Sequence, residues 1–285
     1  MLNLLKQLDR RWIFLAMLLA VVGPILAQKT CPERPTPFVL SVFRKIESLP
    51  EGSIVLIAYD YSPASSGELG PMSTAFLRHC CLKRHKILFL TLYEAGGPVI
   101  DQAIRKVLET EFADLELEPG EDYVNLGFSQ GYEVVIALSA LSLRAAFPTD
   151  TDGASLDDLP LTKNLTNLQD VDLILDLSTG YPGFKEWVQY AATPYGIPFA
   201  AGTTAVGAPQ AYPYIPNQML GLLAAVKGAA EYEAALGEKY PRFREPRLNE
   251  GIRRMAPQFW GHLLVMGLIL LGNTIHFVDR WRGDR

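Results

Sequence analysis

The sequence predicts an α/β protein with a three-layer, Rossmann-like or flavodoxin-like parallel sheet of about five strands, flanked by N- and C-terminal transmembrane helices. Short runs rich in Ile, Val and Leu alternate along the chain with stretches of helical periodicity. Strands that alternate with helices are joined by crossovers, so the sheet should be parallel, with helices on both faces. The two most apolar segments lie near the two ends of the chain, which predicts membrane attachment.

The expected strands are the five apolar runs at residues 53–62, 86–93, 123–128, 171–177 and 197–201. A short helix over 38–49 precedes the first strand, and the connecting helices are expected at 71–83, 98–112, 130–147, 182–191 and 216–236. Four of these helices would begin at a proline: Pro71, Pro98, Pro182 and Pro216. Proline is favoured in the first helical turn because the N–H that it lacks has no partner there.

These elements divide the chain into consecutive regions. We expect an N-terminal transmembrane anchor or signal peptide (1–28), a tether and short helix (29–50), the α/β domain (51–238) with an acidic insertion (148–170), a basic juxtamembrane linker (239–257), a transmembrane helix (258–279) and a basic tail (280–285).

Both ends carry the signals of membrane segments. Lys6, Arg10 and Arg11 precede the apolar run at 12–27, and about twenty apolar residues between Phe259 and Val278 suffice to span a bilayer. Because basic residues at the first segment usually set the orientation, we expect an integral protein of the plasma (inner) membrane with both termini cytoplasmic and the domain outside.

In the second apolar segment, His262, Asn273 and His276 fall near one helical face, with Ile269 between them. Gly261 and Gly272 lie close to this stripe. Such residues usually contact another helix rather than lipid. The expected partner is another transmembrane protein or a second copy of the chain.

Composition restricts the partners and cofactors. The 285 residues carry a formal net charge of -5, which argues against a nucleic-acid partner. No G-x-G-x-x-G follows the first strand, and no G-x-x-x-x-G-K-[ST] is present, so we expect no cofactor. Neither the acidic insertion nor the cysteines show the spacing of a metal site; the cysteines are Cys31, Cys80 and Cys81.

One catalytic motif stands between a strand and a helix, in Gly127-Phe128-Ser129-Gln130-Gly131. This G-x-S-x-G resembles the α/β-hydrolase family, and its carboxylesterase branch in particular, which implies Ser129 as nucleophile. The family also needs a histidine later in the chain. The four histidines do not supply one in the domain: His79 and His85 precede Ser129, and His262 and His276 lie in the second apolar segment.

The ends of the expected strands are polar in every unit, and open parallel sheets bind ligands at that edge. The resulting crevice for a small-molecule or peptide ligand consists of Asp60, Tyr61, Glu94, Ser129, Gln130, Ser178, Thr179, Thr203 and Thr204. With no complete catalytic set, the sequence favours a membrane-anchored binding or assembly subunit of a membrane complex. The alternatives are a serine hydrolase that uses Ser129 and a self-assembling structural membrane protein.

Overall fold

The computed structural model describes residues 9–30 and 33–283, so Cys31 lies outside the described residues. The chain divides into two compact units. One is Glu33–Gly251, and the other joins the described residues of Met1–Pro32 to those of Ile252–Arg285.

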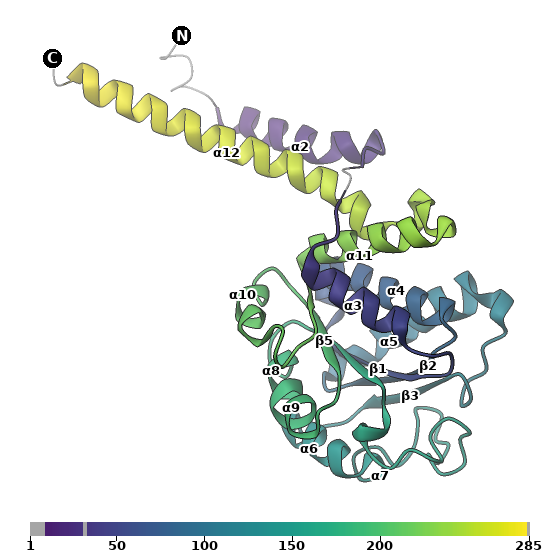
Figure 1. The fold of residues 1–285 in the computed structure, drawn as a ribbon. Helices are drawn as coiled ribbons and strands as arrows, with labels where there is room; N and C mark the ends of the chain where they lie inside the picture. Colours follow the sequence, from purple (N-terminus) through teal and green to yellow (C-terminus); the bar gives the residue numbers. More distant parts are fainter. Residues whose placement is uncertain (1–8, 31–32, 284–285) are drawn as a thin grey trace. The chain divides into compact units, whose positions relative to one another are not determined.

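The larger unit is built on a six-stranded sheet in the order β3-β2-β1-β4-β5-β6, and every neighbouring pair is parallel (Figure 1). The strands are β1 (Ile54–Asp60), β2 (Lys86–Thr91), β3 (Tyr123–Phe128), β4 (Leu173–Ser178), β5 (Phe199–Thr203) and β6 (Leu222–Ala224). The expectation of an α/β parallel sheet is confirmed. This order is that of doubly wound dinucleotide-binding folds, in which the chain reverses direction across the sheet between β1 and β4.

The strand count of about five was wrong, because the predicted helix at 216–236 contains the strand β6, and α11 begins only after it. The three residues Leu222–Ala224 pair with β5 from Ala201 to Thr203. Before them, Gly221 allows the backbone of the neighbouring helix to come close, since an added Cβ would lie 2.1 Å from the carbonyl oxygen of Phe38. A run of small apolar residues fits a helix or a buried strand equally well by pattern alone.

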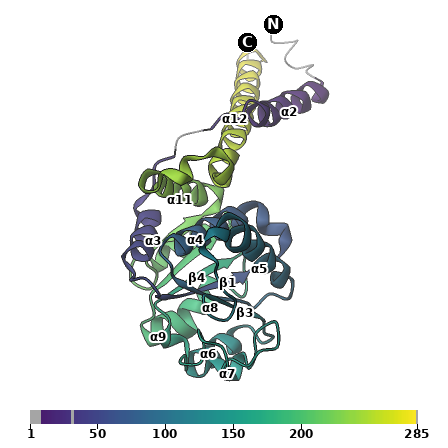
Figure 2. The same ribbon diagram turned by 90° about the vertical axis from the view of Figure 1, so that its right-hand side faces the viewer.

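Helices cover both faces of the sheet, in three layers (Figure 2). One face carries α3 (Pro37–Ser48), α4 (Ser66–Leu82), α5 (Gly97–Ala103) with its π-helical continuation η3 (Ile104–Glu111), and α11 (Ala225–Lys239). The other carries α6 (Glu133–Leu141), α7 (Leu143–Ala146), α8 (Phe184–Trp187) with the π-helical η6 (Val188–Ala192), α9 (Thr193–Tyr195) and α10 (Ala208–Ala211). Short 3-10 turns are η1 (Pro63–Ser65), η2 (Glu94–Gly96), η4 (Ala113–Leu115), η5 (Leu168–Asp170), η7 (Tyr212–Tyr214), η8 (Pro241–Arg244) and η9 (Pro246–Leu248).

The prolines mark helix starts less regularly than expected. Pro98 lies in the first turn of α5, as predicted. Pro71 lies inside α4, which begins earlier at Ser66. Pro182 and Pro216 follow cis peptide bonds and precede α8 and β6. Of the four prolines, Pro98 alone therefore marks a helix start as predicted.

The two end helices are α2 (Arg10–Leu26) and α12 (Glu250–Gly283). Among the described residues, the helix Glu250–Val278 is the one that is long and apolar enough to cross a membrane, and none of its most apolar stretch is buried in the protein. The expected N-terminal span is not found among residues 9–30, the part of that region that the structure describes. With 17 residues, α2 rises only about 26 Å at 1.5 Å per residue, less than the ~30 Å of a bilayer core.

Candidate functional site

A cavity of about 520 Å³ lies at the carboxyl edge of the sheet, beyond the ends of β2 and β3. It is lined by Leu92, Tyr93, Glu94, Ala95, Phe128, Gln130, Tyr132 and Tyr181. Tyr181 comes from the loop after β4, so the lining includes both sides of the point at which the strand order reverses. Two smaller cavities of about 340 and 250 Å³ lie at the opposite, amino edge. Ligands of doubly wound folds bind at the carboxyl edge, which makes the 520 Å³ cavity the candidate site.

Aromatic rings form much of its wall. The rings of Tyr132 and Tyr181 lie 5.4 Å apart between centroids, and both side chains are about half exposed. The Tyr181 hydroxyl donates to Oε2 of Glu133. This hydrogen bond to a carboxylate is the main reason that the pKa of Tyr181 rises to about 12, so the hydroxyl keeps its proton at neutral pH.

The turn that carries Tyr132 is strained. Its backbone has φ 52° and ψ -121°, a conformation that residues with a side chain seldom adopt, and it directly precedes α6. Strain of this kind persists only where the surrounding structure enforces it, and it concentrates at functional sites. The turn presents the Tyr132 ring at the cavity.

Two fully buried carboxyl groups lie on the central strands beneath this edge, Asp60 on β1 and Asp176 on β4. Asp60 accepts from the backbone N–H of Leu92 (2.7 Å, Oδ1) and from Nε1 of Trp187 (2.8 Å, Oδ2). Burial raises the pKa of Asp60 to about 6. Burial, together with the charge of Asp60, raises the pKa of Asp176 well above its ordinary value, so we assign the proton of this pair to Asp176.

Hydrogen bonds connect this pair to both sides of the cavity. Leu92, which Asp60 holds, is itself a lining residue. On the other side, Ser178 donates to Oδ2 of Asp176 (2.6 Å) and accepts from the N–H of Phe184 (3.2 Å), at the end of the loop that carries Tyr181. The walls of the cavity are therefore fixed to one buried polar network.

The structure separates the predicted crevice residues into two groups. Glu94 and Gln130 line the cavity. The other members do not line it; Asp60, Tyr61, Ser178 and Thr203 are buried, and Ser129, Thr179 and Thr204 are partly buried. Sequence reasoning missed Tyr93, Phe128, Tyr132 and Tyr181. A search for aromatic residues at the strand ends and in the loops that follow them would have included all of these.

Ser129 is not arranged as a hydrolase nucleophile. Its hydroxyl donates to the carbonyl oxygen of Ala146 (3.3 Å), and the strained residue of its strand-to-helix turn is Tyr132 instead. Within the described chain, no histidine is hydrogen-bonded to Ser129. His79 lies in the opposite helical layer, between the Tyr232 hydroxyl (2.6 Å) and Glu47 (3.0 Å).

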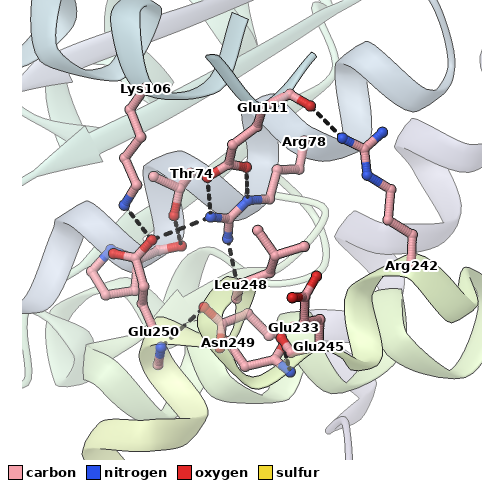
Figure 3. Close-up of polar contacts among 12 residues, drawn as sticks. Thr74, Arg78, Lys106, Glu111, Glu233, Arg242, Glu245, Leu248, Asn249 and Glu250 are labelled. Carbon is pink, nitrogen blue, oxygen red and sulfur yellow. Dashed lines mark hydrogen bonds and ion pairs between the residues drawn. The ribbon is translucent and has the colours of Figure 1, made fainter. Parts of the chain in front are cut away.

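A second polar cluster holds the chain where α12 begins (Figure 3). Arg78 of α4 is almost fully buried and makes two parallel hydrogen bonds to Glu111, at 2.7 and 2.8 Å. It also donates to the carbonyl oxygen of Leu248 (2.6 Å) and to Glu250 (3.3 Å), the first residue of α12. Lys106 donates to the same oxygen of Glu250. We call Arg78, Lys106, Glu111 and Glu250 the Arg78 clamp.

Helix α11 holds both ends of the larger unit with buried carboxylates. Glu231 accepts from the N–H (2.9 Å) and hydroxyl (2.6 Å) of Thr36, immediately before α3. Glu233 accepts from the N–H of Gly251 (3.0 Å), in the first turn of α12. The segments that lead to the two end helices are thus bonded to the same helix.

Along α12, the predicted contact stripe is largely exposed. His262, Ile269, Gly272, Asn273 and His276 are exposed, whereas Gly261 is partly buried. A Cβ at Gly261 would lie 3.9 Å from Cγ2 of Val21 in α2.

Fold and site together define a doubly wound α/β protein with a cavity at the carboxyl edge of its sheet and, among the residues that the structure describes, one helix of membrane-spanning length and composition. A scan against models of protein families found no match, and neither did a search of curated proteins.

Proposed function

We propose that this chain is a membrane-anchored ligand-binding subunit of a membrane protein complex. The observation that carries the proposal is the 520 Å³ cavity at the carboxyl edge, next to the reversal of the strand order. Its volume falls within the range of about 300–1,000 Å³ typical of small-molecule sites. A peptide side chain would fit the same volume.

The anchor in this proposal is α12. Its Glu250–Val278 portion is the described segment that could cross a bilayer. Trp260 and Trp281 flank the most apolar part of α12, where they suit the two membrane interfaces. We place the protein in the plasma (inner) membrane. The expected arrangement with both termini cytoplasmic and the domain outside needs a second span, which the described residues do not supply, so it is not part of this proposal.

The partner would contact the exposed face of α12. His262, Ile269, Asn273 and His276 share that face, and polar side chains at membrane depth are favoured where another helix meets them. The occupant would be another transmembrane protein or a second copy of this chain. The Arg78 clamp would fix the start of the anchor to the binding domain.

The test uses the full chain in lipid nanodiscs and a library of fragment-sized ligands, detected by saturation-transfer NMR. We expect several fragments to bind the wild-type protein and to lose binding in Tyr132→Leu and Tyr181→Leu. The matched control is Tyr212→Leu, which removes an exposed tyrosine that does not line the cavity. A library with no hits, or hits unaffected by both cavity variants, would reject the proposal.

A further inference from the structure

The walls of the cavity combine aromatic faces with negative charge. Four aromatic residues line it, namely Tyr93, Phe128, Tyr132 and Tyr181, and Glu94 is the charged residue among the lining side chains. No lysine, arginine or histidine is found among the described residues that line it.

Two further carboxylates act on the same wall. Glu133 accepts from the Tyr181 hydroxyl, and this bond lowers the pKa of Glu133, which therefore stays ionised at neutral pH. The charge of Glu186 also acts on Tyr181, and its carboxylate is held by the N–H of Gly183 at 2.9 Å. Both groups keep the potential of this wall negative.

The geometry points to an organic cation as the ligand of this cavity: a quaternary ammonium or amine group held against the rings of Tyr132 and Tyr181, with Glu94 as its counter-charge. This inference rests on the proposed function, because it names the ligand class of the same site. The negative face of an aromatic ring attracts cations electrostatically, and tyrosine is among the better rings for this purpose. An anion would meet carboxylates and no basic group. A neutral ligand would gain no charge–charge attraction from the carboxylate of Glu94.

The sources of such a cation are a small amine or the basic side chain of a peptide. Two probe pairs separate them, each measured by calorimetric titration of the full chain in nanodiscs. The first pair is choline and its uncharged isostere, in which carbon replaces the ammonium nitrogen. The second is lysine blocked at both backbone ends and equally blocked norleucine.

We expect at least one cation to bind more tightly than its neutral counterpart, by roughly two- to thirtyfold, the range that corresponds to a cation–aromatic contact. The preference should be lost in Tyr181→Leu and reduced in Glu94→Gln. It should persist in two controls away from the cavity, Tyr212→Leu and Glu238→Gln, since both of these residues are exposed and neither lines it.

The results separate this inference from the proposed function. Equal or weaker binding of both cations relative to their neutral partners overturns the cation assignment. A preference for the cation that persists unchanged in both Tyr181→Leu and Glu94→Gln also overturns it. If library fragments still bind in a manner sensitive to Tyr132→Leu and Tyr181→Leu, the cavity remains a binding site for another ligand class. If neither cations nor fragments bind, both proposals fail.

Discussion

At the residue scale, the carboxyl groups of Asp60 and Asp176 beneath the cavity should make the stability of the protein depend on pH. Asp60 and Asp176 are both fully buried, and a carboxyl that loses water favours its neutral form. Their raised pKa values mean that the folded protein binds protons more tightly than the unfolded chain does. The contribution of the pair to stability is therefore largest at low pH. It falls as pH rises from about 4, the unfolded value, through about 6, the folded pKa of Asp60.

Substitution by asparagine should change the free energy of unfolding in opposite directions at the two positions. Asp176→Asn keeps the shape of the protonated acid, so it should raise the free energy of unfolding more at pH 8 than at pH 4, by at least about 1 kcal/mol. Asp60→Asn turns one acceptor into a donor facing Leu92 N–H or Trp187 Nε1, and should cost about 1–3 kcal/mol. Urea unfolding at the two pH values measures both changes.

A stability change in Asp176→Asn that is the same at pH 4 and pH 8 would show that Asp176 carries no proton in the folded protein. Thr162→Val is a useful comparison, because it also alters a buried polar side chain but cannot introduce a pH dependence.

Sequence reasoning located Asp60 but not its partner. Asp60 ends the apolar run of β1, and a polar residue at the carboxyl end of a strand is an expected ligand position in this fold. Asp176 lies inside a strand, and its nearness to Asp60 depends on the β1–β4 register that pairs it with Ala58. That pairing joins residues more than a hundred positions apart, so no local pattern contains it.

At the scale of elements, the strands were easier to predict than the helices. Buried parallel strands are continuous apolar runs, and β3 begins and ends at the expected residues, Tyr123 and Phe128. The start of α4 and the short strand β6 were not predicted. Their limits depend on packing against neighbouring elements, as the approach of Gly221 to α3 shows.

The close approach at Gly221 predicts a position that does not tolerate a methyl group. Because the added Cβ would lie 2.1 Å from the Phe38 carbonyl oxygen, Gly221→Ala must push α3 away from the sheet. We expect a loss of about 1–3 kcal/mol in the free energy of unfolding, measured by urea denaturation.

Gly97→Ala is the control for this substitution. An added Cβ there meets nothing within 4 Å, and alanine favours the helix α5 that Gly97 begins. Equal stability of Gly221→Ala and wild type would contradict the packing of β6 against α3.

At the scale of the whole molecule, the Arg78 clamp determines how firmly the first turn of α12 is held by the α/β unit. The charges of Arg78, Glu111 and Glu250 are largely removed from water, so each depends on its partners for compensation, whereas Lys106 is partly exposed. The guanidinium keeps its charge: burial opposes it, but Glu111, Glu250 and Glu233 together outweigh burial and raise the pKa of Arg78.

Breaking this clamp should loosen the chain locally before the domain unfolds. Arg78→Met leaves Glu111 and Glu250 without the guanidinium and should cost about 3–5 kcal/mol. We expect faster hydrogen exchange at the amides of Leu248 and Gly251, measured by mass spectrometry.

The double variant Arg78→Met/Glu111→Met should recover part of this loss, because no uncompensated charge remains at that pair. Arg247→Met is the matched control, since Arg247 is 77% exposed and its pair with Glu245 should be worth at most about 1 kcal/mol. Unchanged exchange in Arg78→Met would mean that the segment is retained without Arg78, by contacts such as those of Glu233 and Lys106.

The bonds from α11 to Thr36 and Gly251 also have a mechanical consequence. Tension applied on the N-terminal side of the domain would reach α11 through Glu231, and tension on the C-terminal side would reach α11 through Glu233 and then α4 through Arg78. The load would fall on helices of one face of the sheet before the six strands bear it. We therefore expect the bonds of Glu231 to Thr36 and of Glu233 to Gly251 to rupture first under force, with the cavity still intact.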